Sequence, residues 1–229
     1  MPEFQKGMTK AEKATRSELM LKLSEQNCPT YASLLGLMDL QIMPPDIQPN
    51  PWIAFMLPDK GIIVINSDYL YNPNNSIEQI LFTIKHEILH EWRDHEKRLI
   101  KKLADESGID LTNLSQEEFD KAIEELKNKL YSDDLFNVSA DLEIYNVAAD
   151  PVDQLLIKKI YIGNQVVSAL STDDTPRWKN WGDLSMEDMY DRLRDLKAKT
   201  IEGQFDPESG TFISQEIQNG EGVGVIYGK

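Results

Sequence analysis

The spacing of apolar residues along the chain changes near residue 70. Before it, Trp52–Leu57 and Gly61–Asn66 are short runs of β-branched and aromatic residues separated by Pro58-Asp59-Lys60, which indicates a hairpin. After it, apolar residues recur three and four positions apart, which predicts an amphipathic helix from about Ser76 to His95. The residues that recur at this spacing are Ile77, Ile80, Leu81, Ile84, Ile88 and Leu89. Ser76 can cap the start of the helix.

Three further segments are predicted to be helical. Lys10 to Glu25 has a thin apolar stripe, and Ser115 with Glu118 is typical of a capped start to a helix that runs to Lys129. In residues 137–146 a polar line borders an apolar face, as expected for a helix. The line consists of Asn137, Asp141 and Tyr145. We therefore expect an α+β protein that is mostly helical, with a small mixed sheet or hairpin.

Composition limits the class of protein. The chain has 229 residues, of which 41% are hydrophobic, enough for one sizeable core. Its net charge of −15 argues against binding to nucleic acid, which needs basic patches. No apolar run reaches the ~18 residues of a membrane span, and the start of the sequence lacks a signal peptide's apolar segment, so we expect no membrane partner and a cytoplasmic location. The single cysteine, Cys28, fits a reducing compartment.

The main chemical signal is the run His86-Glu87-Ile88-Leu89-His90. At ~100° per helical residue, the two histidines lie ~40° apart on one face and one turn apart in height, so both can bind one metal ion. Glu87 lies beside them, where it can take a proton from a metal-bound water. This is the H-E-x-x-H arrangement of zinc metalloproteases, in which the glutamate is a general base. The alternative is a surface helix that carries two histidines by chance.

A hydrolytic zinc site needs a third protein ligand, and two residues are candidates. His95 lies five residues after His90, ~140° around a continuous helix, so it can join the site only if the helix ends or unwinds near Arg93 and Asp94. Asp141 lies on the polar line of the later helix. His95 could instead contact one of the residues that bind the metal, and Asp141 could be a solvated carboxylate. Glu143, ~200° around the helix from Asp141, is expected to face solvent.

The order of these motifs resembles a zinc metallopeptidase domain family of bacteria and their phages that often precedes a von Willebrand factor A-like domain. The family shows a strand ending in Asn, then H-E-x-L-H with a further His and Arg, then a helix with N-x-A-x-D, and a short acidic helix. The matching residues here are Ile63 to Asn66, His86 to His90 with His95 and Arg98, Asn137 to Asp141, and Ser185 to Tyr190. Ser139 departs from the pattern, and no von Willebrand-like domain follows.

The resemblance implies a zincin-like metallopeptidase domain over residues 30–200. The sheet or hairpin would pack on the active-site helix and the second motif helix. Residues 1–29 would then be a helical extension, 99–134 a helical insertion, and 201–229 a C-terminal hairpin or flexible tail. A partner protein could be encoded separately, and a phage-encoded chain would act in the host cytoplasm.

These observations predict a zinc-dependent hydrolase for a peptide or protein substrate. Zn²⁺ would be held by His86, His90 and either Asp141 or His95, with Glu87 as the base. Tyr145, His95 and Arg98 are candidates for stabilising the oxyanion, and Asn137 lies on the same polar line. The alternative function is an inactive zincin-like module that serves as a metal-stabilised structural or adaptor protein. A closed site with four protein ligands would favour that alternative.

Overall fold

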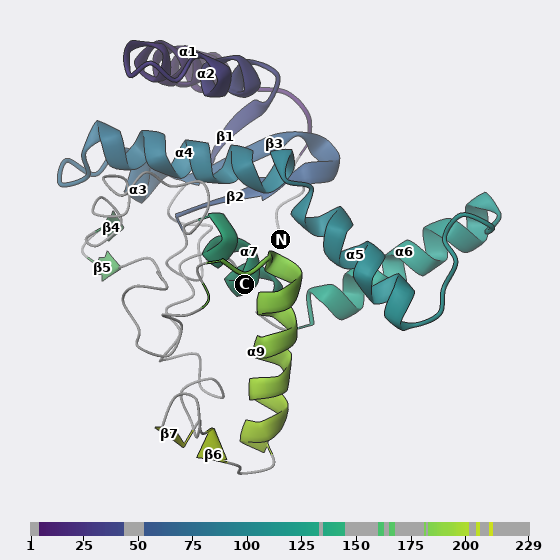
Figure 1. Ribbon diagram of the computed structural model, residues 1–229. Coiled ribbons are helices and arrows are strands. Elements are labelled where there is room, and N and C mark those ends of the chain that lie inside the picture. Colours follow the sequence, from purple (N-terminus) through teal and green to yellow (C-terminus); the bar gives the residue numbers. More distant parts are fainter. Residues whose placement is uncertain are drawn as a thin grey trace. The chain divides into compact units, whose positions relative to one another are not determined.

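The computed structural model describes residues 5–43, 53–132, 135–144, 160–162, 165–167, 181, 183–201, 205–206 and 211–212. Most of these residues are helical, and a small mixed sheet of three strands accompanies the helices, which confirms the α+β class (Figure 1). The contacts divide the chain into two compact units. The first comprises residues 1–93, 149–169 and 226–229, and the second comprises residues 94–148 and 170–225. The domain boundaries predicted from the sequence stay a prediction.

The sheet of the first unit has β3 (Ile62–Asn66) at its centre. β3 pairs in parallel with β1 (Asp39–Met43) and antiparallel with β2 (Ala54–Leu57). β2, β3 and the 3₁₀ turn η2 (Pro58–Lys60) form the predicted hairpin, and Gly61 leaves the turn at φ 62°, a left-handed conformation that glycine adopts without strain. β1 was not predicted. Trp52, expected to start the hairpin, lies outside the described residues.

Both faces of the sheet are covered at its central strand. All five side chains of β3 are buried. Ile62 and Val64 pack with Met43 on one face, and since strand side chains alternate, Ile63 and Ile65 point to the other. A strand buried on both faces reads as a continuous apolar run, which explains the sequence of β3.

Two helices precede β1 and lie side by side (Figure 1). α1 (Lys10–Glu25) has the predicted bounds and starts at a capping box in which Thr9 and Glu12 bond each other's backbone amides. α2 (Pro29–Gly36) follows. Their interior is formed by Leu19, Leu23, Ala32 and Leu35, all buried.

The outer side of β1 is bonded by residues that come before α1 and at its start. The amide of Ile42 donates to the Glu12 carboxylate at 2.9 Å, and the amide of Leu40 donates to the Met8 sulfur at 3.3 Å. Without these bonds, the two amides would be available to pair with another strand. The segment from Met8 to Glu12 therefore covers this edge of the sheet.

The first unit also contains the short helix α3 (Ser67–Leu70), the helix α4 (Ile77–Trp92) and a pair of short strands. α3 is capped by Asn66, and α4 follows it. β4 (Ile160–Ile162) and β5 (Gln165–Val167) form an antiparallel pair. Asn75 fixes this pair, because its side chain donates to the Tyr161 carbonyl at 2.7 Å and accepts from the Tyr161 amide at 2.8 Å.

Four helices of the second unit lie within the described residues. They are α5 (His95–Glu106), α6 (Gln116–Leu130), α7 (Leu135–Glu143) and α9 (Met186–Ile201). α5 packs on α6, while α7 and α5 both contact α9. Ser115 and Glu118 form the predicted capping box of α6. The predicted insertion, residues 99–134, supplies part of the buried core of this unit, including Leu103 and Leu130.

Two further predicted features lie outside the described residues. They are Tyr145 and most of residues 201–229. Within that last range the structure describes one antiparallel pair, β6 (Phe205–Asp206) with β7 (Thr211–Phe212). No helix among the described residues is long and apolar enough to cross a membrane.

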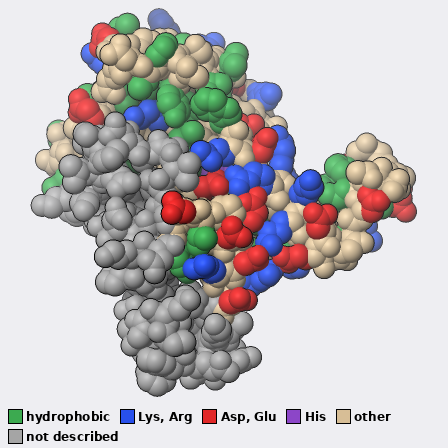
Figure 2. All heavy atoms as spheres, viewed as in Figure 1, with side chains coloured by type: hydrophobic (Ala, Val, Ile, Leu, Met, Phe, Trp, Pro, Cys, Tyr) green, Lys and Arg blue, Asp and Glu red, His purple; other side chains and the backbone are tan. Residues whose placement is uncertain are grey.

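Basic side chains of the second unit are paired with acidic ones. Figure 2 shows blue and red side chains interleaved over the region where Figure 1 draws α5 and α9. Lys102 contacts Asp191 at 2.8 Å and Glu106 at 3.0 Å, and Arg194 contacts Glu106 at 2.8 Å. The pairs Lys102–Asp191 and Arg194–Glu106 connect α5 to α9, whereas Lys102–Glu106 lies within α5.

Candidate metal centre

The H-E-x-x-H motif lies in the second half of α4. Ser76 caps this helix: its hydroxyl accepts from the Gln79 amide at 3.3 Å, and Gln79 accepts from the Ser76 amide at 2.8 Å. The cap fixes where the helix begins, and with it the face on which each later residue lies. The first turn carries Glu78, which favours the positive end of the helix dipole.

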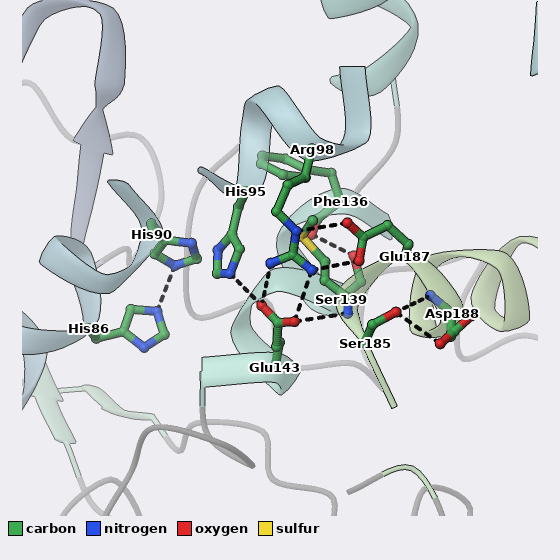
Figure 3. Close-up of polar contacts among 11 residues, drawn as sticks. His86, His90, His95, Arg98, Phe136, Ser139, Glu143, Ser185, Glu187 and Asp188 are labelled. Carbon is green, nitrogen blue, oxygen red and sulfur yellow. Dashed lines mark hydrogen bonds and ion pairs between the residues drawn. The ribbon is translucent and has the colours of Figure 1, made fainter. Parts of the chain in front are cut away.

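His86 and His90 lie one turn apart, and their Nε2 atoms point toward each other (Figure 3). Their Nε2 atoms are 2.9 Å apart, and the ring centroids are 4.6 Å apart. Two ring nitrogens at this separation can share one proton, or both can direct lone pairs at one metal ion. The pair therefore supplies two of the nitrogen ligands that Zn²⁺ prefers.

Glu87 and His86 are both buried, with exposed fractions of 2% and 1%. Taking a carboxylate out of water costs several kcal/mol, so a buried glutamate beside a histidine pair is not an ordinary surface residue. The burial of both residues does not fit an exposed helix, while metal binding by the motif stays a prediction.

The helix that bears the motif ends at Trp92, three residues earlier than predicted. Asp94 has φ 52° and ψ 38°, in the left-handed region, and α5 begins with His95. The predicted continuous helix to His95 is therefore wrong. The helix does end near Arg93 and Asp94, which is the condition under which His95 was expected to be able to join the metal site.

His95 bonds to a carboxylate within the second unit. Its Nε2 lies 2.8 Å from Glu143 Oε2, and His95 and Glu143 are 1% and 4% exposed (Figure 3). The prediction that Glu143 faces solvent is wrong. α7 is buried on more than one side, because it contacts α9 while Glu143 meets α5, so a residue ~200° around from Asp141 is again inside the protein.

Arg98 joins two carboxylates to one guanidinium. It donates to both oxygens of Glu143, at 2.9 and 3.0 Å, and to both oxygens of Glu187, at 2.7 and 2.6 Å. Glu143 also accepts from the backbone amide of Met186 at 3.2 Å. Burial by itself would raise the pKa of Glu143, but the hydrogen bonds from His95 and Arg98 outweigh it and hold the pKa far below its usual range.

The remaining predicted site residues are on α7. Asn137 and Asp141 lie one turn apart on this helix and both are half-buried. Tyr145, the third residue of the predicted polar line, is outside the described residues. The structure thus describes two of the three residues of the predicted polar line.

Sequence reasoning missed Glu143 and Glu187 as members of the network. A signal for Glu143 exists in its own helix. Phe136, Ser139 and Ala140, which stand seven, four and three residues before it, are all buried, so they mark the face on which Glu143 lies. For Glu187 no such signal is present, because its partner Arg98 is 89 residues away in sequence.

Comparisons with known proteins give no match. No protein-family model, no curated protein and no solved structure matches the chain.

Proposed function

We propose that the protein is a zinc-dependent metallopeptidase with a zincin-like arrangement around α4. The observation that carries the proposal is the His86–His90 pair, whose Nε2 atoms face each other at 2.9 Å beside the buried Glu87. With Asp141 these histidines make a group of side chains that could hold a metal ion. Two imidazoles and one carboxylate are the ligand set of a catalytic zinc site that keeps one position open.

Each residue has a defined role in the proposed reaction. His86, His90 and Asp141 would hold the ion. When bound, Zn²⁺ polarises a scissile carbonyl and lowers the pKa of a water molecule towards ~7. Glu87 would accept the proton of that water and pass it to the leaving amine, so that the peptide bond is cleaved with one water consumed.

The environment of His95 bears on the alternative of a closed structural site. Its Nε2 is bonded to Glu143, and Arg98 donates to the same carboxylate. We therefore assign His95 to the support of α7 and not to a fourth ligand position. Arg98 has its guanidinium engaged by two carboxylates, which makes it a weak candidate for stabilising an oxyanion.

The first experiment measures metal content by elemental analysis in protein purified without added metal. We expect one zinc per chain in the wild type and loss of zinc in His86→Ala. Protein that holds no metal even after zinc is supplied would contradict the proposal.

The second experiment measures cleavage of a quenched-fluorescence peptide library. Glu87→Gln should retain zinc and lose turnover, because a base is removed and no ligand is. Glu78→Gln is the matched control, since the same change is made at an exposed position in the first turn of the same helix. Turnover that persists in Glu87→Gln would refute the mechanism.

The third experiment identifies the third ligand. Asp141→Ala should lose zinc affinity, whereas His95→Ala should keep a zinc ion bound. The opposite pattern would assign the position to His95. Zinc that survives in both variants would mean that neither residue is the third ligand.

A further inference from the structure

The carboxylate of Glu143 accepts four hydrogen bonds within the second unit. It accepts hydrogen bonds from His95 and Arg98 on α5 and from the backbone amide of Met186 at the start of α9 (Figure 3). Charge-assisted hydrogen bonds of this kind are about twice as strong as neutral ones. One residue of α7 is thus fixed to two neighbouring helices.

Arg98 is the centre of this network. Its guanidinium is planar and presents donors on two sides, one facing Glu143 of α7 and the other facing Glu187 of α9. A lysine has the same charge, but its ammonium group cannot donate paired hydrogen bonds to a carboxylate on each of two sides. The geometry of the network therefore depends on an arginine at this position.

The network also determines the rotation of α7. Glu143 and Asp141 are two residues apart on that helix, so their side chains lie ~200° apart around its axis. Fixing Glu143 on one side sets the direction of Asp141 on the other. Because α7 has only nine residues, a single fixed side chain near its end controls a large part of the helix.

We propose that Arg98 is a positioning residue for Asp141, acting through Glu143. The proposal rests on the proposed function, since it takes Asp141 to be the third metal ligand. Arg98 would contribute no atom to the metal site. Its effect would be to hold the Asp141 side chain in one direction before the metal binds. This raises the affinity for zinc, because Asp141 then loses less conformational freedom on binding.

The test compares two Arg→Lys variants by zinc affinity, measured in competition with a chromophoric chelator. Removing a residue that orients a metal ligand typically costs 10- to 100-fold in affinity, so Arg98→Lys should bind zinc about 10-fold more weakly than the wild type. Arg194→Lys is the matched control, because Arg194 also connects α9 to α5, and its hydrogen bonds among the described residues go to Glu106 and Asp191. Its zinc affinity should be unchanged.

A second comparison separates positioning from a general loss of structure. In an Asp141→Asn background, Arg98→Lys should weaken zinc binding no further, since the residue through which it acts has been changed. Hydrogen exchange on the metal-free protein gives a readout without zinc: amides of α7 should exchange faster in Arg98→Lys and not in Arg194→Lys. If Arg98→Lys does not fold, Glu143→Gln replaces it in both comparisons.

The outcomes distinguish this inference from the proposed function. Wild-type affinity in Arg98→Lys, or an equal loss with and without Asp141→Asn, would overturn the positioning role and leave the metallopeptidase proposal in place. A wild-type protein that binds no zinc would overturn both.

Discussion

Substitutions at Asp94 test whether the chain really breaks between α4 and α5. In a continuous helix, alanine is more stable than glycine by about 1 kcal/mol. Asp94 has φ 52° and ψ 38° and does not cap α5 with its side chain, so it occupies a left-handed conformation for which glycine is suited. The structure therefore predicts the reverse order, with Asp94→Gly more stable than Asp94→Ala.

The size of the difference follows from two opposing terms. A side chain in the left-handed region costs about 1–2 kcal/mol, whereas glycine loses about 0.5–1 kcal/mol more conformational freedom on folding. Glycine should then be ahead of alanine by roughly 0.5–1 kcal/mol. The contact between Asp94 and Lys97, 2.6 Å long and between exposed side chains, is lost in both variants and cancels in the comparison.

The assay is urea denaturation followed by circular dichroism at 222 nm. With a denaturant slope of about 2 kcal/mol per M, the two midpoints should differ by about 0.3–0.5 M. Equal midpoints, or a higher midpoint for alanine, would mean that residue 94 is helical.

Three further predictions concern stability. Ser76→Ala removes the cap of α4 and should lower the free energy of unfolding by about 1 kcal/mol, measured by urea denaturation. Hydrogen bonds from Arg194 and Lys102 lower the pKa of Glu106 from 4.5 to about 2. This stabilisation is present above pH 4.5 and is lost as the pH falls towards 2, so Glu106→Gln should cost about 1 kcal/mol at pH 7, after allowance for solvent screening, and less at pH 3. A cost that does not change with pH would contradict it. Asn75→Ala should speed hydrogen exchange at Tyr161, because both backbone groups of Tyr161 lose their side-chain partner, and unchanged exchange would exclude that role.

The local elements could be predicted from the sequence because their signals are local. The bounds of α1 follow from Thr9 and Glu12, and the start of α6 follows from Ser115 and Glu118, each pair forming a capping box within four residues. The hairpin of β2 and β3 follows from β-branched runs around a turn that contains proline. The histidine pair follows from helical geometry alone.

The features that were missed depend on partners far away in sequence. β1 was not predicted because it is parallel to β3, and no turn signal announces a parallel partner. The break at Asp94 has neither glycine nor proline to mark it. Glu143 was expected to face solvent, because the residues of α5 and α9 that contact it are far away in sequence. In each case tertiary contacts, and not local preference, decide the outcome.

The cover on the outer side of β1 has a consequence for solubility. An edge strand with unpaired amides is a template to which another chain can add a strand, which leads to aggregation. Here the amides of Leu40 and Ile42 are bonded to Met8 and Glu12. When a side chain accepts the hydrogen bond of a strand amide, that amide can no longer pair with a strand of a neighbouring molecule. The residues around α1's first turn thus keep this edge of the sheet from recruiting other copies of the chain.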